Sequence, residues 1–295
     1  MRLAADLGGT HARFALDAVT TRVDLAAADY RALDDAVADA LTRFGTTARA
    51  LHAVIAVAGP VHGARAAFTN LAWTVDADAL ARRFGFATVQ LLNDAEAAAR
   101  AAAHALPDDA MIVQAGPRDP HARHALIGVG TGLGVAFWRG EEIDATEAGH
   151  AGFAPAEEWQ RDLAIALEHE FGRASWERVL SGPGLARIDA HLRGAAAGEA
   201  AVVAARAASG DAVARDALRR FSSLLGAFAG DLVLAAPAAG GVLLAGGVLA
   251  RVGDLFDAAA FRAGLAAKGR FASRLAALPV WRTADDALAL RGALR

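Results

Sequence analysis

The chain contains no cysteine among its 295 residues, and this absence excludes disulfide bonds and cysteine-ligated zinc. A reducing compartment needs no disulfide bonds, so the absence is compatible with a cytoplasmic location, which we predict. The chain also lacks a strong excess of either charge, because its formal net charge is -3 at pH 7. That balance gives no electrostatic reason to expect nucleic acid or an anionic membrane as a partner. We therefore expect a small-molecule ligand, in a chain long enough for two domains.

An uninterrupted membrane-spanning run is missing as well. Residues 232–250, LVLAAPAAGGVLLAGGVLA, carry no charge and approach the length that a bilayer requires. However, Pro237 and two glycine pairs interrupt the run. We expect a helix end, a turn at Pro237 and then a short buried strand. At the N-terminus Asp6 interrupts the apolar stretch, so we expect no signal peptide there.

Short apolar runs that end near glycine alternate with helical patterns, which is typical of an α/β protein. One helix is expected over 212–235, where large apolar residues recur every three or four positions, and another over 95–105. Residues 193–211 are expected to form a helix with a loop. Six runs are expected to be buried strands: RLAADLGG, HAVIAVAGP, TVQLLND, AMIVQAG, HALIGVGTG and GVLLAGGV.

Two segments suggest an internal duplication. LAADLGGTHARFAL at residues 3–16 and LIGVGTGLGVAFW at residues 126–138 both indicate a strand, a turn rich in glycine and threonine, and a second strand. In the first segment the glycine pair has two interpretations. It either permits a tight hairpin turn, because glycine adopts positive φ without steric cost, or it lets the backbone approach a phosphate closely beside Asp6.

Glycine turns recur at three separated places, and together they favour nucleotide binding over three unrelated turns. Exposed N–H groups in such turns bind phosphate oxygens, and neighbouring threonines add hydroxyl donors. No Walker A pattern and no G-x-G-x-x-G at the start of a helix is present. The turns consist of Gly8, Gly9 and Thr10; of Gly130, Thr131 and Gly132; and of Gly246 and Gly247.

The motifs DLGGTHAR, FTNLAW, LLNDAEA, GVGTGLGVA, EAGHAGFAP, ERVLSGPGL, GGVLLAGGV and FRAGLAAKGRF, in this order, resemble the bacterial glucokinase family. That family belongs to the superfold of sugar kinases, heat-shock proteins and actin. The resemblance implies a duplicated actin-like (ribonuclease H-like) α/β ATPase fold with a sugar and MgATP in a cleft between two domains. We expect a small domain over 1–104, completed by 284–295, and a large domain over 105–283. A homodimer is common in the family, so a homodimer is the assembly that the resemblance implies.

The resemblance assigns a catalytic base and a set of sugar ligands. Asp94 matches the base that accepts the proton of the attacking sugar hydroxyl. From the residues alone, Asp94 suits a helix N-cap equally well. The matched sugar ligands are Asn70, Asn93, Glu147, His150 and Glu177. The alternative for Asn93 is also a helix N-cap, and for each of the others it is an ordinary turn, loop or helix-surface residue.

The resemblance also assigns the phosphate and metal contacts. Asp6 matches the acid that faces Mg²⁺ through water. The glycine turns match contacts to ATP, with Gly246 and Gly247 against the adenosine. The sequence departs from the family pattern at His11, where asparagine is usual; at Ala95, where an aromatic residue is common; and at Asp285-Asp286-Ala287-Leu288, in place of Asn-Pro-Gly.

The function that these motifs imply is ATP-dependent phosphorylation of D-glucose to glucose 6-phosphate. Two alternatives stay open: a kinase for another hexose or an amino sugar, and a protein that senses a sugar without turnover. The three departures support the second alternative, whereas no basic patch or helix-turn-helix extension points to a DNA-bound regulator.

Overall fold

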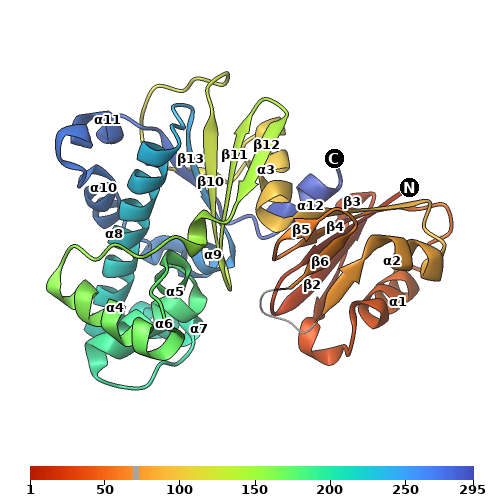
Figure 1. Cartoon of the computed structure of the whole chain (residues 1–295), viewed down its shortest axis with the longest axis horizontal. Coiled ribbons are helices and arrows are strands. Elements are labelled where there is room, and N and C mark those ends of the chain that lie inside the picture. Colours follow the sequence, from red (N-terminus) through yellow and green to blue (C-terminus); the bar gives the residue numbers. More distant parts are fainter. Residues whose placement is uncertain (69–72) are drawn as a thin grey trace. The chain divides into compact units, whose positions relative to one another are not determined.

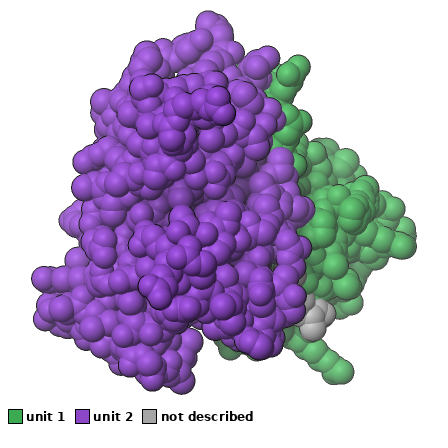
Figure 2. Space-filling model, turned by 60° about the vertical axis from the view of Figure 1, so that its left-hand side comes forward, with its two compact units in different colours: residues 1–107, 140–145, 287–295 green, residues 108–139, 146–286 purple. Residues whose placement is uncertain are grey.

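A computed structural model describes residues 1–68 and 73–295, which form two compact units (Figures 1 and 2). Unit 1 comprises residues 1–107, 140–145 and 287–295, and unit 2 comprises residues 108–139 and 146–286. The domain limits expected from the sequence stay a proposal. Asn70 lies outside the described residues.

Unit 1 contains a five-stranded sheet in the order β3-β2-β1-β4-β8. Strand β1 is antiparallel to β2 and parallel to β4, and β4 is parallel to β8. The strands are β1 (Arg2–Leu7), β2 (His11–Leu16), β3 (Ala18–Ala26), β4 (His52–Val57) and β8 (Thr88–Asn93). A small sheet holds β5 (Val61–His62), β6 (Arg65–Ala67) and β7 (Thr74–Asp76), and the helices are α1 (Leu33–Arg43), α2 (Ala77–Phe84), α3 (Asp94–His104) and α12 (Leu288–Ala293).

The alternation of side chains along β1 divides the core of unit 1 into two layers. Leu3, Ala5 and Leu7 pack in one cluster with buried residues of α1 and α2. Ala4 packs on the other face, in a cluster with residues of α3 and α12. Because every second residue of a strand shares a face, Asp6 lies on the same face as Ala4, the face that α3 and α12 cover.

A six-stranded sheet with the order β12-β11-β10-β13-β14-β9 repeats this arrangement, and all its strands belong to unit 2 except β12, most of whose residues are assigned to unit 1. Strand β10 is antiparallel to β11 and parallel to β13, and β13 is parallel to β14. These relations match those of β1 with β2, β4 and β8, so the duplication expected from the two glycine hairpins is present in the topology. The strands are β9 (Met111–Gln114), β10 (His124–Val129), β11 (Leu133–Arg139), β12 (Glu142–Thr146), β13 (Gly241–Ala245) and β14 (Val280–Arg282).

Helices pack around the unit 2 sheet, and the longest of them has the predicted bounds. Helix α8 runs from Ala212 to Ala235, and its apolar residues Leu218, Phe221, Leu225, Phe228 and Leu232 are all buried. The other helices are α4 (Glu158–Phe171), α5 (Trp176–Val179), α6 (Gly182–Arg193), α7 (Ala200–Ala208), α9 (Gly247–Val252), α10 (Ala258–Ala266) and α11 (Ala272–Ala276).

All six predicted strands form, but the expectation that each is fully buried is wrong at two of them. Met111 and Ile112 of β9 are exposed because β9 is the edge strand of its sheet, and β8 is likewise an edge strand with exposed residues. Residues 232–250 contain the expected end of α8 and the expected strand β13, but their last residues begin α9, a helix that the sequence analysis did not predict. Among the described residues, no helix combines the length and the apolar character needed to cross a membrane.

One buried histidine makes a testable contribution to stability. His124, the first residue of β10, is 7% exposed and stacks on Trp138 with ring centroids 4.8 Å apart, and its buried Nδ1 has no hydrogen-bond partner. Burial lowers the pKa of His124 from its ordinary value of 6.5. The folded state therefore binds this proton less readily than the unfolded state.

We expect the free energy of unfolding to fall as the pH drops below 6.5, because the unfolded chain then protonates His124 first. Replacement His124→Phe keeps an aromatic ring beside Trp138 and removes the titration, so it should flatten this loss. Urea unfolding at several pH values measures the effect, with exposed His62→Asn as the control. An unchanged pH dependence in His124→Phe would contradict the assignment.

Candidate functional site

The first candidate residues lie at the carboxyl end of β1. Asp6 is 9% exposed, and its Oδ2 lies 3.3 Å from Nη1 of Arg13, the residue opposite it in β2. The pairing follows from the hairpin register, which sets the two side chains on the same face. Arg13 was missed as a candidate functional residue by the sequence analysis, although it ends the motif DLGGTHAR; its charge opposite Asp6 could have identified it.

The turn between β1 and β2 does not depend on the special conformation of glycine at Gly8. The N–H of Gly8 donates to the carbonyl of His11 over 2.9 Å. The φ angle of Gly8 lies outside the left-handed region, and a Cβ there would lie 3.7 Å from that carbonyl, an ordinary contact. The contacts of the hairpin therefore do not require glycine at this position.

Asn93 and Asp94 lie at the end of β8 and the start of α3, and the structure separates their roles. Oδ1 of Asn93 accepts from the N–H groups of Ala95 at 2.9 Å and Glu96 at 3.3 Å, so Asn93 is the N-cap. Its Nδ2 donates to the carbonyl of Gly59. Asp94 is the first helical residue, and its Oδ1 also accepts from Ala95 N at 2.7 Å. The N-cap interpretation of Asp94 is wrong, because Asn93 fills that position.

The two candidate acids of unit 1, Asp6 and Asp94, lie at the same edge of its sheet. Asp6 is in register with Ala56 of β4, which is in register with Leu92 of β8. The carboxyl ends of β1 and β8 are thus two strand spacings apart, about 10 Å. The N-terminus of α3 favours a negative charge at Asp94. Ligands of open α/β sheets commonly bind outside the carboxyl ends of strands, where these two acids lie.

In unit 2, the hairpin between β10 and β11 meets the glycine pair that follows β13. The N–H of Gly130 donates to the carbonyl of Gly132, and the carbonyl of Gly130 accepts from the N–H of Gly182, each over 2.9 Å. Gly246 has φ +107°, and a Cβ there would collide with the backbone of Val129. Gly246 is therefore required by the packing of the two loops. Gly130 is different, because a Cβ there would meet no atom within 4 Å.

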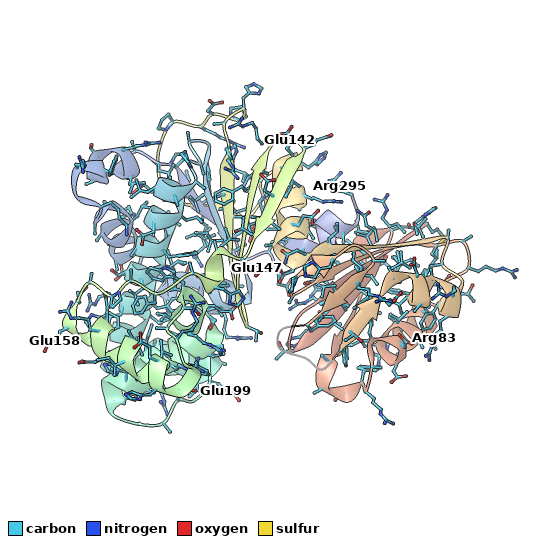
Figure 3. The ribbon with its side chains drawn as sticks, in the orientation of Figure 1. Arg83, Glu142, Glu147, Glu158, Glu199 and Arg295 are labelled. Atoms are coloured by element: carbon cyan, nitrogen blue, oxygen red, sulfur yellow. The ribbon has the colours of Figure 1, made fainter. Side chains whose placement is uncertain are left out.

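Three of the predicted sugar ligands lie together in unit 2. His150 Nε2 is 3.7 Å from Glu147 Oε2, and His150 Nδ1 is 3.8 Å from Glu177 Oε1. Glu147 follows β12 (Figure 3), and Glu177 is in the short helix α5. The side chain of Glu177 is 18% exposed, whereas Glu147 and His150 are more open. The structure thus brings together two carboxylates and an imidazole, groups that bind vicinal hydroxyls.

A cavity of about 430 Å³ lies elsewhere in unit 2, and none of the residues predicted from the sequence lines it. It is bordered by the end of α6, the loop after it and the start of α7. An ion-pair network borders it: Arg193 binds Asp189 at 2.9 Å and Asp211 at 2.8 Å. The pairing with Arg193 lowers the pKa of Asp211 to about 2. We therefore interpret this network as a link between α6 and α8.

The departures from the family pattern leave the proposed groups in place. His11 is exposed and contributes its carbonyl to the β1–β2 turn. Ala95 is buried in the first turn of α3. Helix α12 begins at Leu288, and its N-cap Ala287 provides no side-chain hydrogen bond.

Comparisons with known proteins cover nearly the whole chain. The family model described as glucokinase matches residues 3–295. A glucokinase of Caulobacter sp. (strain K31) is 36% identical over 309 residues, with 99% of this chain and 93% of that protein covered. The crystal structure of a glucokinase from an Antarctic psychrotroph has a TM-score of 0.77 at 30% identity, covering 99% of this chain and 97% of that one.

A more distant structure agrees in fold. The structure of a ROK family glucokinase from Streptomyces griseus in complex with glucose and AMPPNP has a TM-score of 0.71 at 22% identity, covering 99% of this chain and 97% of that one. The family match over nearly the whole chain and the identity to curated relatives show the membership directly: this chain belongs to the glucokinase family.

Proposed function

We propose that the chain transfers the γ-phosphoryl group of ATP to the 6-hydroxyl of D-glucose, with Asp94 as the general base. One observation supports this base most strongly. Asn93 is the N-cap of α3, and Asp94 is the first helical residue, so the cap does not depend on the carboxylate of Asp94. As the phosphoryl group arrives, the hydroxyl loses its proton to the carboxylate. The products are glucose 6-phosphate and ADP.

The sugar ligands have complementary hydrogen-bonding roles. Glu147 and Glu177 accept hydrogen bonds from sugar hydroxyls, and His150 between them can donate to or accept from a hydroxyl. Such contacts hold the sugar in one orientation, and orientation accounts for a large part of the catalysis of phosphoryl transfer. Asn70, outside the described residues, stays a proposed ligand from the sequence.

The phosphate contacts are assigned to the glycine turns of both units. Gly8, Gly9 and Thr10 follow β1, and Gly130, Thr131 and Gly132 follow β10, the equivalent strand of the duplication. We assign the phosphoryl oxygens to the threonine hydroxyls and to the N–H groups of these turns other than those of Gly8 and Gly130, which donate to the carbonyls of His11 and Gly132. Gly246 and Gly247 are assigned to the adenosine side.

Magnesium fits the residues present. Mg²⁺ binds through one or two carboxylates together with phosphates and water, rather than in an all-protein cage. Among the residues that the structure describes, no group of three or more potential ligands forms such a cage, and Asp6 is a single buried carboxylate beside the phosphate turn. When bound, the ion neutralises charge on the phosphates. We propose that Asp6 holds it through water, with Arg13 fixing the carboxylate.

The sugar specificity is tested by ADP release with MgATP over glucose, mannose, fructose, galactose and N-acetylglucosamine. The proposal predicts the highest kcat/KM with glucose. A higher kcat/KM with another sugar would favour a kinase for another hexose or an amino sugar. Stabilisation by glucose against heat without ADP release from any sugar would favour the sensing alternative.

We further propose that the protein acts in the cytoplasm. We also propose a small domain over 1–104, completed by 284–295, and a large domain over 105–283. Finally, we propose that the protein forms a homodimer. Size-exclusion chromatography with light scattering measures the assembly directly. A monomeric mass at the working concentration would contradict the dimer.

A further inference from the structure

A glycine of the phosphate hairpin leaves space for one of the sugar ligands. The N–H of Leu133 donates to Oε2 of Glu177 over 3.1 Å, so the backbone of the hairpin holds this carboxylate. A Cβ placed on Gly132 would lie 2.6 Å from the same Oε2 and 3.4 Å from Cδ of Glu177. Real Cβ atoms do not approach an oxygen that closely, so any side chain at position 132 would displace the carboxylate.

The need for glycine at this position comes from Glu177 alone. The φ angle of Gly132 lies outside the left-handed region, and Glu177 supplies both atoms within 4 Å of the added Cβ. The neighbouring Gly130 has open space at the equivalent point. An alanine at 132 would therefore be compatible with the backbone of the hairpin but not with the position of Glu177.

Leu133, whose N–H holds Glu177, also supports the segment that carries Glu147 and His150. Gly149, buried between Glu147 and His150, packs against the carbonyl of Leu133 so closely that a Cβ there would overlap it. His150 in turn lies 3.8 Å from Glu177. The N–H of Leu133 thus holds one sugar ligand, and its carbonyl supports the segment that carries the other two.

We propose that Gly132 and the backbone of Leu133 are positioning elements for the sugar, in addition to the assignment of this hairpin to phosphate. This inference rests on the proposed glucose site. Because Gly132 has no side chain, the carboxylate of Glu177 has room beside the hairpin. The N–H of Leu133 fixes that carboxylate in the orientation that binds a sugar hydroxyl.

Replacement Gly132→Ala tests the inference through sugar binding without nucleotide. We expect the Kd for glucose, measured by calorimetry, to rise at least about tenfold, because one fixed ligand is displaced. Gly130→Ala is the matched change on the same hairpin and should leave the glucose Kd without nucleotide near the wild-type value. Gly198→Ala, in a loop with open space around the added methyl, is the control for adding a methyl group.

A double-mutant cycle with Glu177→Ala separates positioning from general damage to the hairpin. Without the carboxylate, an alanine at 132 has nothing to displace, so Gly132→Ala should not weaken glucose binding further in that background. If Gly132→Ala weakens binding equally with and without Glu177, or not at all, the inference is wrong. The proposed function fails separately, if the wild type neither binds nor phosphorylates glucose.

Thermal unfolding without ligand gives a second measurement, which does not depend on the sugar. Displacing Glu177 removes the acceptor of the Leu133 N–H, so Gly132→Ala should lower Tm by about 2–4 °C with Glu177 present. This loss should vanish in the Glu177→Ala background. Equal losses in both backgrounds would overturn the proposed contact even in a protein that binds no glucose.

Discussion

Replacing Asp94 with asparagine should lower kcat for glucose phosphorylation at least about a hundredfold, the range that a general base contributes. Asparagine retains an oxygen that can accept from the N–H of Ala95, and Asn93 still caps α3, so the helix should be unchanged. Loss of the carboxylate leaves no group to take the proton of the 6-hydroxyl. The effect should therefore appear in kcat, measured by coupled ADP release.

Glu96→Gln is the matched control for Asp94→Asn. Glu96 is the other acid in the first turn of α3, and its Oε1 pairs with Arg100 at 2.9 Å, away from any assigned role. This variant removes one negative charge from the same helix end and should keep kcat close to the wild-type value. If Asp94→Asn retains wild-type kcat while the glucose Kd is unchanged, the base is another residue.

The second large effect is expected at Gly130, where a single methyl group should weaken the use of ATP. A Cβ at this position meets no protein atom within 4 Å, so the fold permits alanine. If the hairpin N–H groups contact the phosphates, the methyl group projects into the space they occupy. We expect kcat/KM for ATP to fall about 10- to 100-fold, with Tm close to that of the wild type.

Two other glycines distinguish this effect from damage to the fold. Gly246→Ala should lower Tm, because Gly246 has φ +107° and a Cβ there would collide with Val129. Gly198→Ala should change neither stability nor kcat/KM for ATP. Equal behaviour of Gly130→Ala and Gly198→Ala in ATP kinetics would contradict the assignment of the hairpin to phosphate.

The sequence predicts the elements well wherever the hydrophobic pattern is strong. Helix 212–235 and the strands at both glycine hairpins form as expected, because their apolar periods match the faces that they bury. The sequence predicts that β8 and β9 are buried, and this prediction is wrong because both are edge strands. An apolar run does not show whether a strand lies at the edge of a sheet. The topological duplication was visible only as a weak repeat of two hairpins.

The residues of the candidate site were predicted from motifs, but their contacts were not. The motif LLND contains both a cap and the proposed base, and only the hydrogen bonds of Asn93 separate the two roles. The link between Gly132 and Glu177 joins residues 45 positions apart and leaves no local pattern in the sequence. Arg13 is similar, because its pairing with Asp6 depends on the register of the hairpin.

The central claim is that the chain moves the γ-phosphoryl group of ATP to carbon 6 of glucose, and phosphorus NMR observes this transfer directly. With wild-type protein, MgATP and glucose labelled with ¹³C at position 6, the account predicts that ADP and a phosphomonoester coupled to that carbon appear in equal amounts. Release of inorganic phosphate in place of the ester, or no change in the ATP signals while glucose is bound, would contradict it.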